Sequence, residues 1–313
     1  MPDSFSSWPD FFYTLKCEEP LYLTEDDKQN SYYNIPIANT TCLLLGTGTS
    51  ITQAAMRMLA QAGVMVGFCG GGGTPLLMAT EIEWLSPQSE YRPTEYIQGW
   101  LGFWFDDDKR LAAAKELQQS RLAFLQTTWS KDRDLKQEGF DASIPLITSL
   151  LNEFSEKITK ADRVGKLLQL EADLTKKLYK LAASNTGFQG FSRERESTDT
   201  ANEFLNHGNY LAYGLAATAL WVLGIPHGFA VMHGKTRRGA LVFDVADLIK
   251  DAIILPWAFI CAKEKATEQE FRQQCLQAFT NHKALEFMFN EVKRTAFMFS
   301  APDAEQDEEG NNL

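Results

Sequence analysis

The chain has 313 residues, of which 44% are apolar, and a formal net charge of −11. It can bury one large core or two moderate ones, and we expect two domains. The sequence has no signal-peptide pattern and no apolar run of membrane-spanning length, which predicts a cytoplasmic protein. The odd number of cysteines, without Cys-x-x-Cys spacing, argues against a disulfide framework and a zinc ribbon. We expect small core residues at Cys17, Cys42, Cys69, Cys261 and Cys275.

The first hundred residues carry a net charge of −7 and read as short strands separated by Gly and Pro. One helix is expected here, from Ser50 to Ala62 with Ser50 as its N-cap. The predicted strands are 21–23, 41–45, 64–68 and 74–78.

Gly46-Thr-Gly48 between a strand and a helix invites a rival interpretation as a dinucleotide-binding turn. Ile51 stands where the third glycine belongs, and the next strand offers no acidic residue for a ribose. We therefore expect an ordinary strand-to-helix turn.

From about Phe105 onward the apolar periodicity is helical, which predicts an α+β chain with a small β-rich N-terminal domain and a larger all-helical one. The predicted helices are 107–129, 145–158, 163–183, 199–223, 243–264, 267–279 and 283–298. The domains are expected at 1–104 and 105–301, followed by a disordered acidic tail at 302–313. The tail carries five negative charges, and its competition with DNA phosphates for basic side chains is as plausible as an inert solubilising role.

One glutamate interrupts an apolar helix face. Glu171 lies about 40° from Leu167 and 20° from Leu178 around the predicted helix. Burial of an unpaired carboxylate costs several kcal/mol, so Glu171 should contact a cation, a donor or a metal, unless it reaches solvent at the edge of the stripe.

A second acidic group follows a histidine. Asp244, Asp247 and Asp251 fall within about 60° of one another on the next predicted helix, and His233 ends the extended run before it. Imidazole and carboxylate ligands suit Mn²⁺ or Mg²⁺ better than Zn²⁺ here. The alternative is that these aspartates cap and stabilise the helix N-terminus.

Two further features flank this group. Residues 151–250 carry a net charge of +2, and Lys235, Arg237 and Arg238 lie between His233 and the acidic helix. This loop is a candidate for phosphate contact or an ordinary solvated turn. A polar stripe on the helix 199–223 could orient the metal ligands; it comprises Asn202, Asn206, Asn209 and Tyr213.

Three segments together resemble the CRISPR-associated adaptation integrases of the Cas1 family, most closely subtype I-F. They are Leu-Leu-Gln-Leu-Glu171-Ala-Asp-Leu, Asp199-Thr-Ala-Asn202 with Leu-Ala-Tyr213-Gly, and His233 followed by Phe-Asp244-Val-Ala-Asp247-Leu-Ile-Lys. The resemblance implies that Glu171, His233 and Asp247 bind the metal, that Asp244 is a further catalytic residue beside them, and that Tyr213 lies close to the active site.

The resemblance also implies an activity and partners. The activity is metal-dependent insertion of foreign double-stranded DNA fragments into CRISPR repeat DNA by transesterification, with Mg²⁺ or Mn²⁺ as cofactor. The partners are a second copy of the chain, bound through the N-terminal domain, and a Cas2 protein fused to the Cas3 helicase-nuclease. Two alternatives are a nuclease on branched or single-stranded DNA without a role in integration, and a catalytically idle scaffold.

Overall fold

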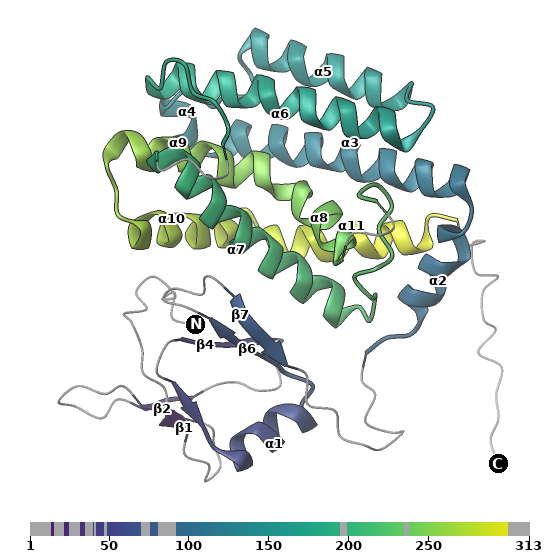
Figure 1. The fold of residues 1–313 in the computed structure, drawn as a ribbon, viewed down its shortest axis with the longest axis vertical. Helices are drawn as coiled ribbons and strands as arrows, with labels where there is room; N and C mark the ends of the chain where they lie inside the picture. The colour runs from purple at the N-terminus through teal and green to yellow at the C-terminus, as the bar shows by residue number, and fades with distance from the viewer. Residues whose placement is uncertain are drawn as a thin grey trace.

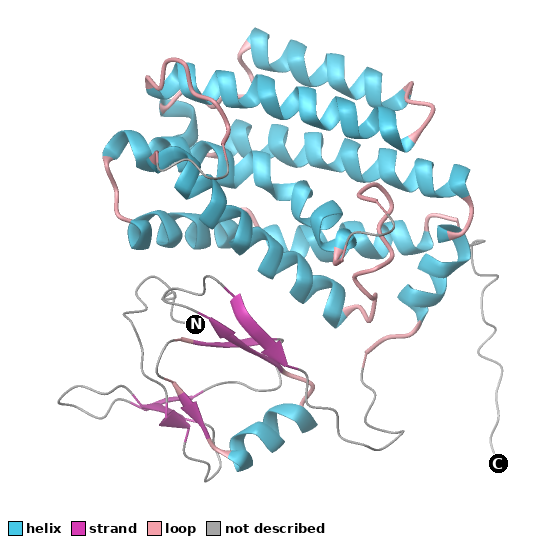
Figure 2. Cartoon of the chain, in the orientation of Figure 1, coloured by secondary structure: helices cyan, strands magenta, loops and turns pink. Residues whose placement is uncertain are grey.

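A computed structural model describes residues 92–194, 199–234 and 238–299 continuously, and parts of the stretch 14–80. The N-terminal part holds short strands and one helix, and the remainder is helical (Figure 2). None of the described helices is long and apolar enough to cross a membrane. The predicted acidic tail at 302–313 lies outside the described residues, as do Lys235 and Arg237.

The described strands form three small sheets. β1 (Thr14–Leu15) pairs parallel with β5 (Ser50–Ile51), and β2 (Tyr22–Thr24) pairs antiparallel with β3 (Tyr32–Asn34). The third sheet has the order β4-β6-β7, formed by Cys42–Leu45, Met65–Cys69 and Leu76–Thr80. Four of these strands overlap the predicted ones. A single β-rich domain with the predicted boundaries stays a prediction.

The predicted start of the first helix at Ser50 is wrong. Ser50 and Ile51 pair with β1, and the helix α1 (Gln53–Gln61) begins three residues later. Its N-cap is Thr52, whose hydroxyl accepts a hydrogen bond from the backbone N–H of Ala55 at 3.2 Å.

The helical part begins earlier than predicted, at α2 (Glu95–Trp104), where Trp100 and Phe103 are fully buried. α3 (Asp107–Lys131), α5 (Pro145–Thr159) and α6 (Val164–Thr186) lie side by side (Figure 1). The other helices are α4 (Arg133–Gln137), α7 (Thr200–Val222), α8 (Ala240–Ile249), α9 (Leu255–Glu264), α10 (Glu268–Asn281) and α11 (Ala284–Phe297).

The predicted continuous helix 243–264 is interrupted by a π-helical turn, η4 (Lys250–Ile254). Pro256 explains the break, because it has no N–H to donate to the carbonyl of Ala252 and its ring would clash there in an α-helix. The indole Nε1 of Trp129 on α3 donates to that carbonyl instead, at 3.0 Å. The turn is therefore tied to α3.

α7 packs closely against this turn at Gly208. A Cβ atom at that position would overlap the side chain of Ile254. The absence of a side chain at Gly208 thus lets α7 approach the segment that follows the acidic residues of α8.

Candidate metal centre

Asp244 fixes the segment that carries His233. Its carboxylate accepts backbone hydrogen bonds from Val231, Met232 and His233 at 2.8, 3.1 and 3.0 Å. It also lies 2.7 Å from Nδ1 of His233. A carboxylate at Nδ1 favours the tautomer that carries its proton there, so Nε2 is free to act as a ligand.

Side-chain atoms of two acidic residues lie close to this nitrogen. Nε2 of His233 lies 3.9 Å from Oε2 of Glu171 on α6 and 3.9 Å from Oδ2 of Asp247 on α8. Ligand atoms of the three residues all lie within 4.8 Å of one another. Two ligands on one divalent ion with bonds of about 2.1 Å can be up to about 4.2 Å apart, so the group fits an ion after small adjustments.

Glu171 is held in a setting that disfavours its charge. Its side chain is 18% exposed. Burial and the neighbouring charge of Asp247 raise the pKa of Glu171 to about 7, against the attraction of Arg121. Glu171 therefore has a partner within the protein, and a bound cation would favour its ionised form further.

Asp247 is almost completely buried, at 2% exposure. Burial would raise its pKa, but the charges of Lys250, Arg121 and His233 outweigh that effect and lower it. The ammonium of Lys250 forms an ion pair with its Oδ1 atom. The other carboxylate oxygen, Oδ2, has no hydrogen bond within the described part of the chain and could therefore serve as a metal ligand.

The pKa of His233 responds to opposing influences. Burial lowers it, whereas the hydrogen bond to Asp244 and the charges of Asp247, Asp244 and Glu171 together raise it above the ordinary value. The imidazole is thus prepared to carry positive charge until a metal takes the proton's place on Nε2.

Arg121 on α3 supports the acidic side of the centre. The guanidinium, 3% exposed, lies 3.9 Å from Oε1 of Glu171 and pairs with Asp251, to which its Nε donates at 2.8 Å. It also donates to Thr175 at 2.9 Å and to Gln118 at 3.2 Å. Asp251 is therefore neutralised by an arginine and does not join the predicted acidic stripe at the metal group.

The capping interpretation of the aspartates is wrong for the residues at the centre. α8 begins at Ala240 after Gly239, which adopts a left-handed conformation, and no side chain caps it. Asp244 and Asp247 lie beyond its first turn. Asp244, predicted as a catalytic residue, contacts His233 through its hydrogen-bonded carboxylate, and its catalytic role stays a prediction.

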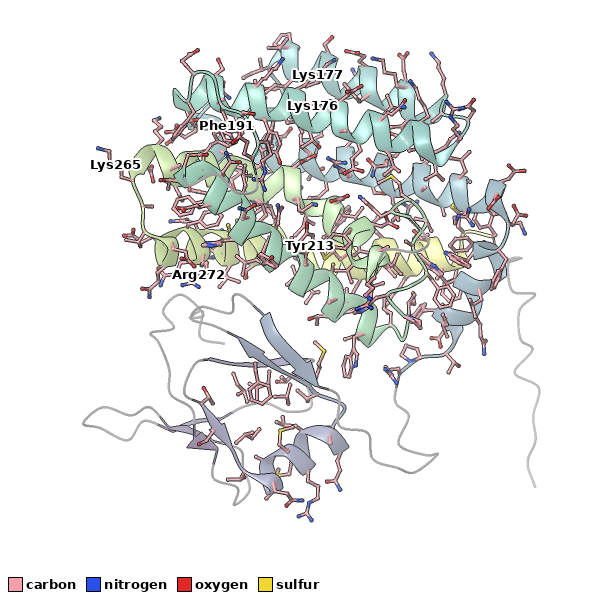
Figure 3. The ribbon with its side chains drawn as sticks, in the orientation of Figure 1. Lys176, Lys177, Phe191, Tyr213, Lys265 and Arg272 are labelled. Carbon is pink, nitrogen blue, oxygen red and sulfur yellow. The ribbon has the colours of Figure 1, made fainter. Side chains whose placement is uncertain are left out.

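The polar stripe on α7 divides into two parts. Asn202 and Asn206 accept hydrogen bonds from Arg193 at 2.8 and 2.6 Å, so they hold the preceding loop and not the metal ligands. Tyr213, labelled in Figure 3, lies with its ring centre 5.3 Å from the ammonium of Lys250. Of the predicted basic loop, Arg238 is described, and it is exposed.

Arg121 and Lys250 are not among the predicted residues of the centre. Arg121 has a detectable signal, because it lies four residues from both Leu117 and Leu125 on a buried helix face, as Glu171 does in its own stripe. Lys250 has one as well, because it lies three residues after Asp247 on the predicted helix, a spacing at which opposite charges pair.

A family model and two similar proteins all point to the same family. Residues 14–294 match the family described as CRISPR associated protein Cas1. A "CRISPR-associated endonuclease Cas1" from Pseudomonas aeruginosa is 56% identical over 88% of this chain and 87% of its own length. Its counterpart from Pectobacterium atrosepticum is 55% identical over 89% and 87%.

Solved structures share the fold. A Cas1 protein from Thermotoga maritima superposes with a TM-score of 0.68 at 16% identity, covering 96% of this chain and 98% of its own. A casposase bound to integration product superposes with a TM-score of 0.62 at 13% identity, over 96% and 92% of the two chains.

Proposed function

The chain belongs to the Cas1 family of CRISPR-associated proteins, and from this premise we propose that it is a metal-dependent DNA integrase and endonuclease. Its 55–56% identical relatives come from Pseudomonas aeruginosa and Pectobacterium atrosepticum. The proposed reaction inserts a foreign DNA fragment at a CRISPR repeat by transesterification. The observation that carries the proposal is the convergence of Glu171, His233 and Asp247, from three separate segments, on one small volume.

Glu171, His233 and Asp247 would hold Mg²⁺ or Mn²⁺. A divalent ion in such a site polarises a phosphoryl oxygen and stabilises the leaving oxygen of a phosphodiester. Asp244 keeps the Nδ1 proton of His233 in place, so that Nε2 stays available as a ligand. Arg121 holds Glu171 and Asp251 in fixed positions and neutralises part of their charge.

The DNA strand would approach from the side of Arg238 and Tyr213. Arg238 is exposed at the start of α8, and in this proposal it contacts a backbone phosphate together with Lys235 and Arg237 of the same loop. Double-stranded fragment DNA and repeat DNA are the proposed substrates. One solved structure with the same fold, at 20% sequence identity, is a Cas1–DNA complex.

The proposed assembly has three components. Another neighbour in fold is part of a complex named Cas6-RT-Cas1–Cas2. We propose by analogy that two copies of this chain form a homodimer and bind a Cas2 protein, fused to Cas3 as the subtype I-F resemblance implies. Light scattering at micromolar concentration tests the dimer, and a monomer there contradicts it.

A strand-transfer assay tests the activity. A labelled duplex is incubated with supercoiled plasmid carrying a CRISPR repeat, with the Cas2 partner and with or without Mn²⁺. Joined product that requires the metal supports integration, whereas cleavage of branched or single-stranded DNA without joining identifies a nuclease of another role. Glu171→Ala, His233→Ala and Asp247→Ala should each abolish joining, and a scaffold protein would keep its function in all three.

A further inference from the structure

The two metal-ligating carboxylates share a pattern in how their oxygens are used. Oε2 of Glu171 and Oδ2 of Asp247 each lie 3.9 Å from Nε2 of His233. Their other oxygens face cations of the protein. Oε1 of Glu171 lies 3.9 Å from Arg121, and Oδ1 of Asp247 pairs with Lys250.

In two-metal phosphoryl-transfer sites, the ions lie about 3.5–4 Å apart and stabilise the attacking and the leaving oxygen. A carboxylate commonly bridges such ions through its two oxygens. In this chain the second oxygen of each carboxylate already faces a positive side chain. A second metal ion at either oxygen would be repelled by the positive charge of Arg121 or Lys250.

The two cations differ in exposure and in partners. Arg121 is 3% exposed and is occupied by Asp251, Thr175 and Gln118. Lys250 is 21% exposed, and Asp247 is the carboxylate that it pairs with. The ring of Tyr213 lies 5.3 Å from its ammonium and packs at 4.8 Å against Phe243. Lys250 is thus held against Asp247 and Tyr213 and keeps a fifth of its side chain exposed.

The charges agree with this geometry. Four carboxylates and two permanent cations leave an excess of two negative charges when His233 is neutral, which one divalent ion balances. The carboxylates are those of Glu171, Asp244, Asp247 and Asp251, and the cations are Arg121 and Lys250.

We infer that Lys250 takes the place of a second metal ion, limiting the centre to one divalent ion per chain and presenting a second positive charge to the reacting phosphate. The inference rests on the proposed metal site. A purely structural Lys250, which only holds Asp247 in position, makes the opposite prediction for metal binding, because its removal should weaken the site.

The test is Mn²⁺ binding to the full chain at pH 8, by calorimetry and by electron paramagnetic resonance. Wild-type protein and Lys250→Arg should bind one ion. Lys250→Met should bind the first ion at least about 10-fold more tightly, since a nearby positive charge is removed, and take up a second ion with a spin-coupled signal. Lys263→Met is the control, because Lys263 pairs with Glu138 on the surface and should leave binding unchanged.

Circular dichroism shows whether each variant is folded. Lys250→Gln is measured in the same way, so that the test still stands if Lys250→Met folds poorly. Weaker or unchanged binding of a single ion by the folded variants overturns the inference and leaves the metal site intact. Two ions in wild-type protein overturn it as well. No ion in wild-type protein overturns the metal site and the inference together.

Discussion

The substitution Glu171→Gln should stabilise the metal-free protein and remove its response to metal. A rise of the pKa of Glu171 from 4.5 to about 7 corresponds to about 3 kcal/mol against the ionised form in the folded state. Because the folded pKa is raised, this group's stabilising contribution is complete below pH 4.5 and is lost as the pH rises through 7. At pH 8 the amide, which cannot ionise, avoids that cost.

We expect a gain of about 1–3 kcal/mol at pH 8, since Arg121 keeps Asp251 as a partner but loses the attraction of Glu171. At roughly 2–4 °C per kcal/mol, the melting temperature should rise by about 2–12 °C, and by much less at pH 5. Mn²⁺ at 100 times its Kd should stabilise wild-type protein by about 2.7 kcal/mol. The Glu171→Gln variant lacks one charged ligand, so Mn²⁺ should stabilise it much less.

Differential scanning fluorimetry at pH 5 and pH 8, with and without Mn²⁺, measures both effects. Glu153→Gln is the matched control, because Glu153 is a half-exposed carboxylate on α5 that pairs with surface lysines. It should leave the metal response unchanged. The reasoning is refuted if Glu171→Gln destabilises the metal-free protein at pH 8, or if it gains as much from Mn²⁺ as wild-type protein does.

Three further predictions concern pH, orientation and packing. Mn²⁺ affinity should rise by about 10–100-fold from pH 6 to pH 8 with release of protons, because Glu171 and His233 both have raised pKa values and must lose a proton to bind; a flat calorimetric profile contradicts this. Asp244→Asn should weaken Mn²⁺ binding by about 10–100-fold, less than Asp247→Asn, and equal losses in calorimetry would place Asp244 among the ligands. Gly208→Ala should lower the free energy of unfolding, measured in urea, by about 1–3 kcal/mol, because the new Cβ atom overlaps η4. Gly214→Ala on the same helix should raise it by up to about 1 kcal/mol, because a Cβ atom there meets nothing within 4 Å. Equal effects of the two substitutions would contradict the close packing at Gly208.

The long helices from α3 onward were predictable because each has an apolar periodicity, whereas α2 and the five-residue α4 were not predicted. The proximity of Glu171 and Asp247 was foreseeable because Glu171 and the Asp244–Asp247 pair break the expected pattern for their helices. The break at η4 was missed because a proline near the middle of an apolar run was given too little weight against the periodicity. The contacts of Arg121 were missed because they join segments that periodicity treats separately, whereas the pair of Asp247 and Lys250 has a detectable spacing of three residues.

The N-terminal elements show the opposite situation. β5 was assigned to a helix because a two-residue strand has no periodicity of its own and exists only through its pairing with β1. Local pattern indicates a helix start at a capping residue, and both Ser50 and Thr52 are suitable. Only the distant strand decides between them.

The π-helical turn before Pro256 divides one long helical segment into two mechanical units. α8 carries Asp244 and Asp247, whereas α9 is buried in the core along most of its length. An unbroken helix transmits an axial shift from one end to the other, but here the junction is anchored sideways to Trp129 of α3. We therefore expect core substitutions in α9 to displace the carboxylates of α8 less than they would in an unbroken helix.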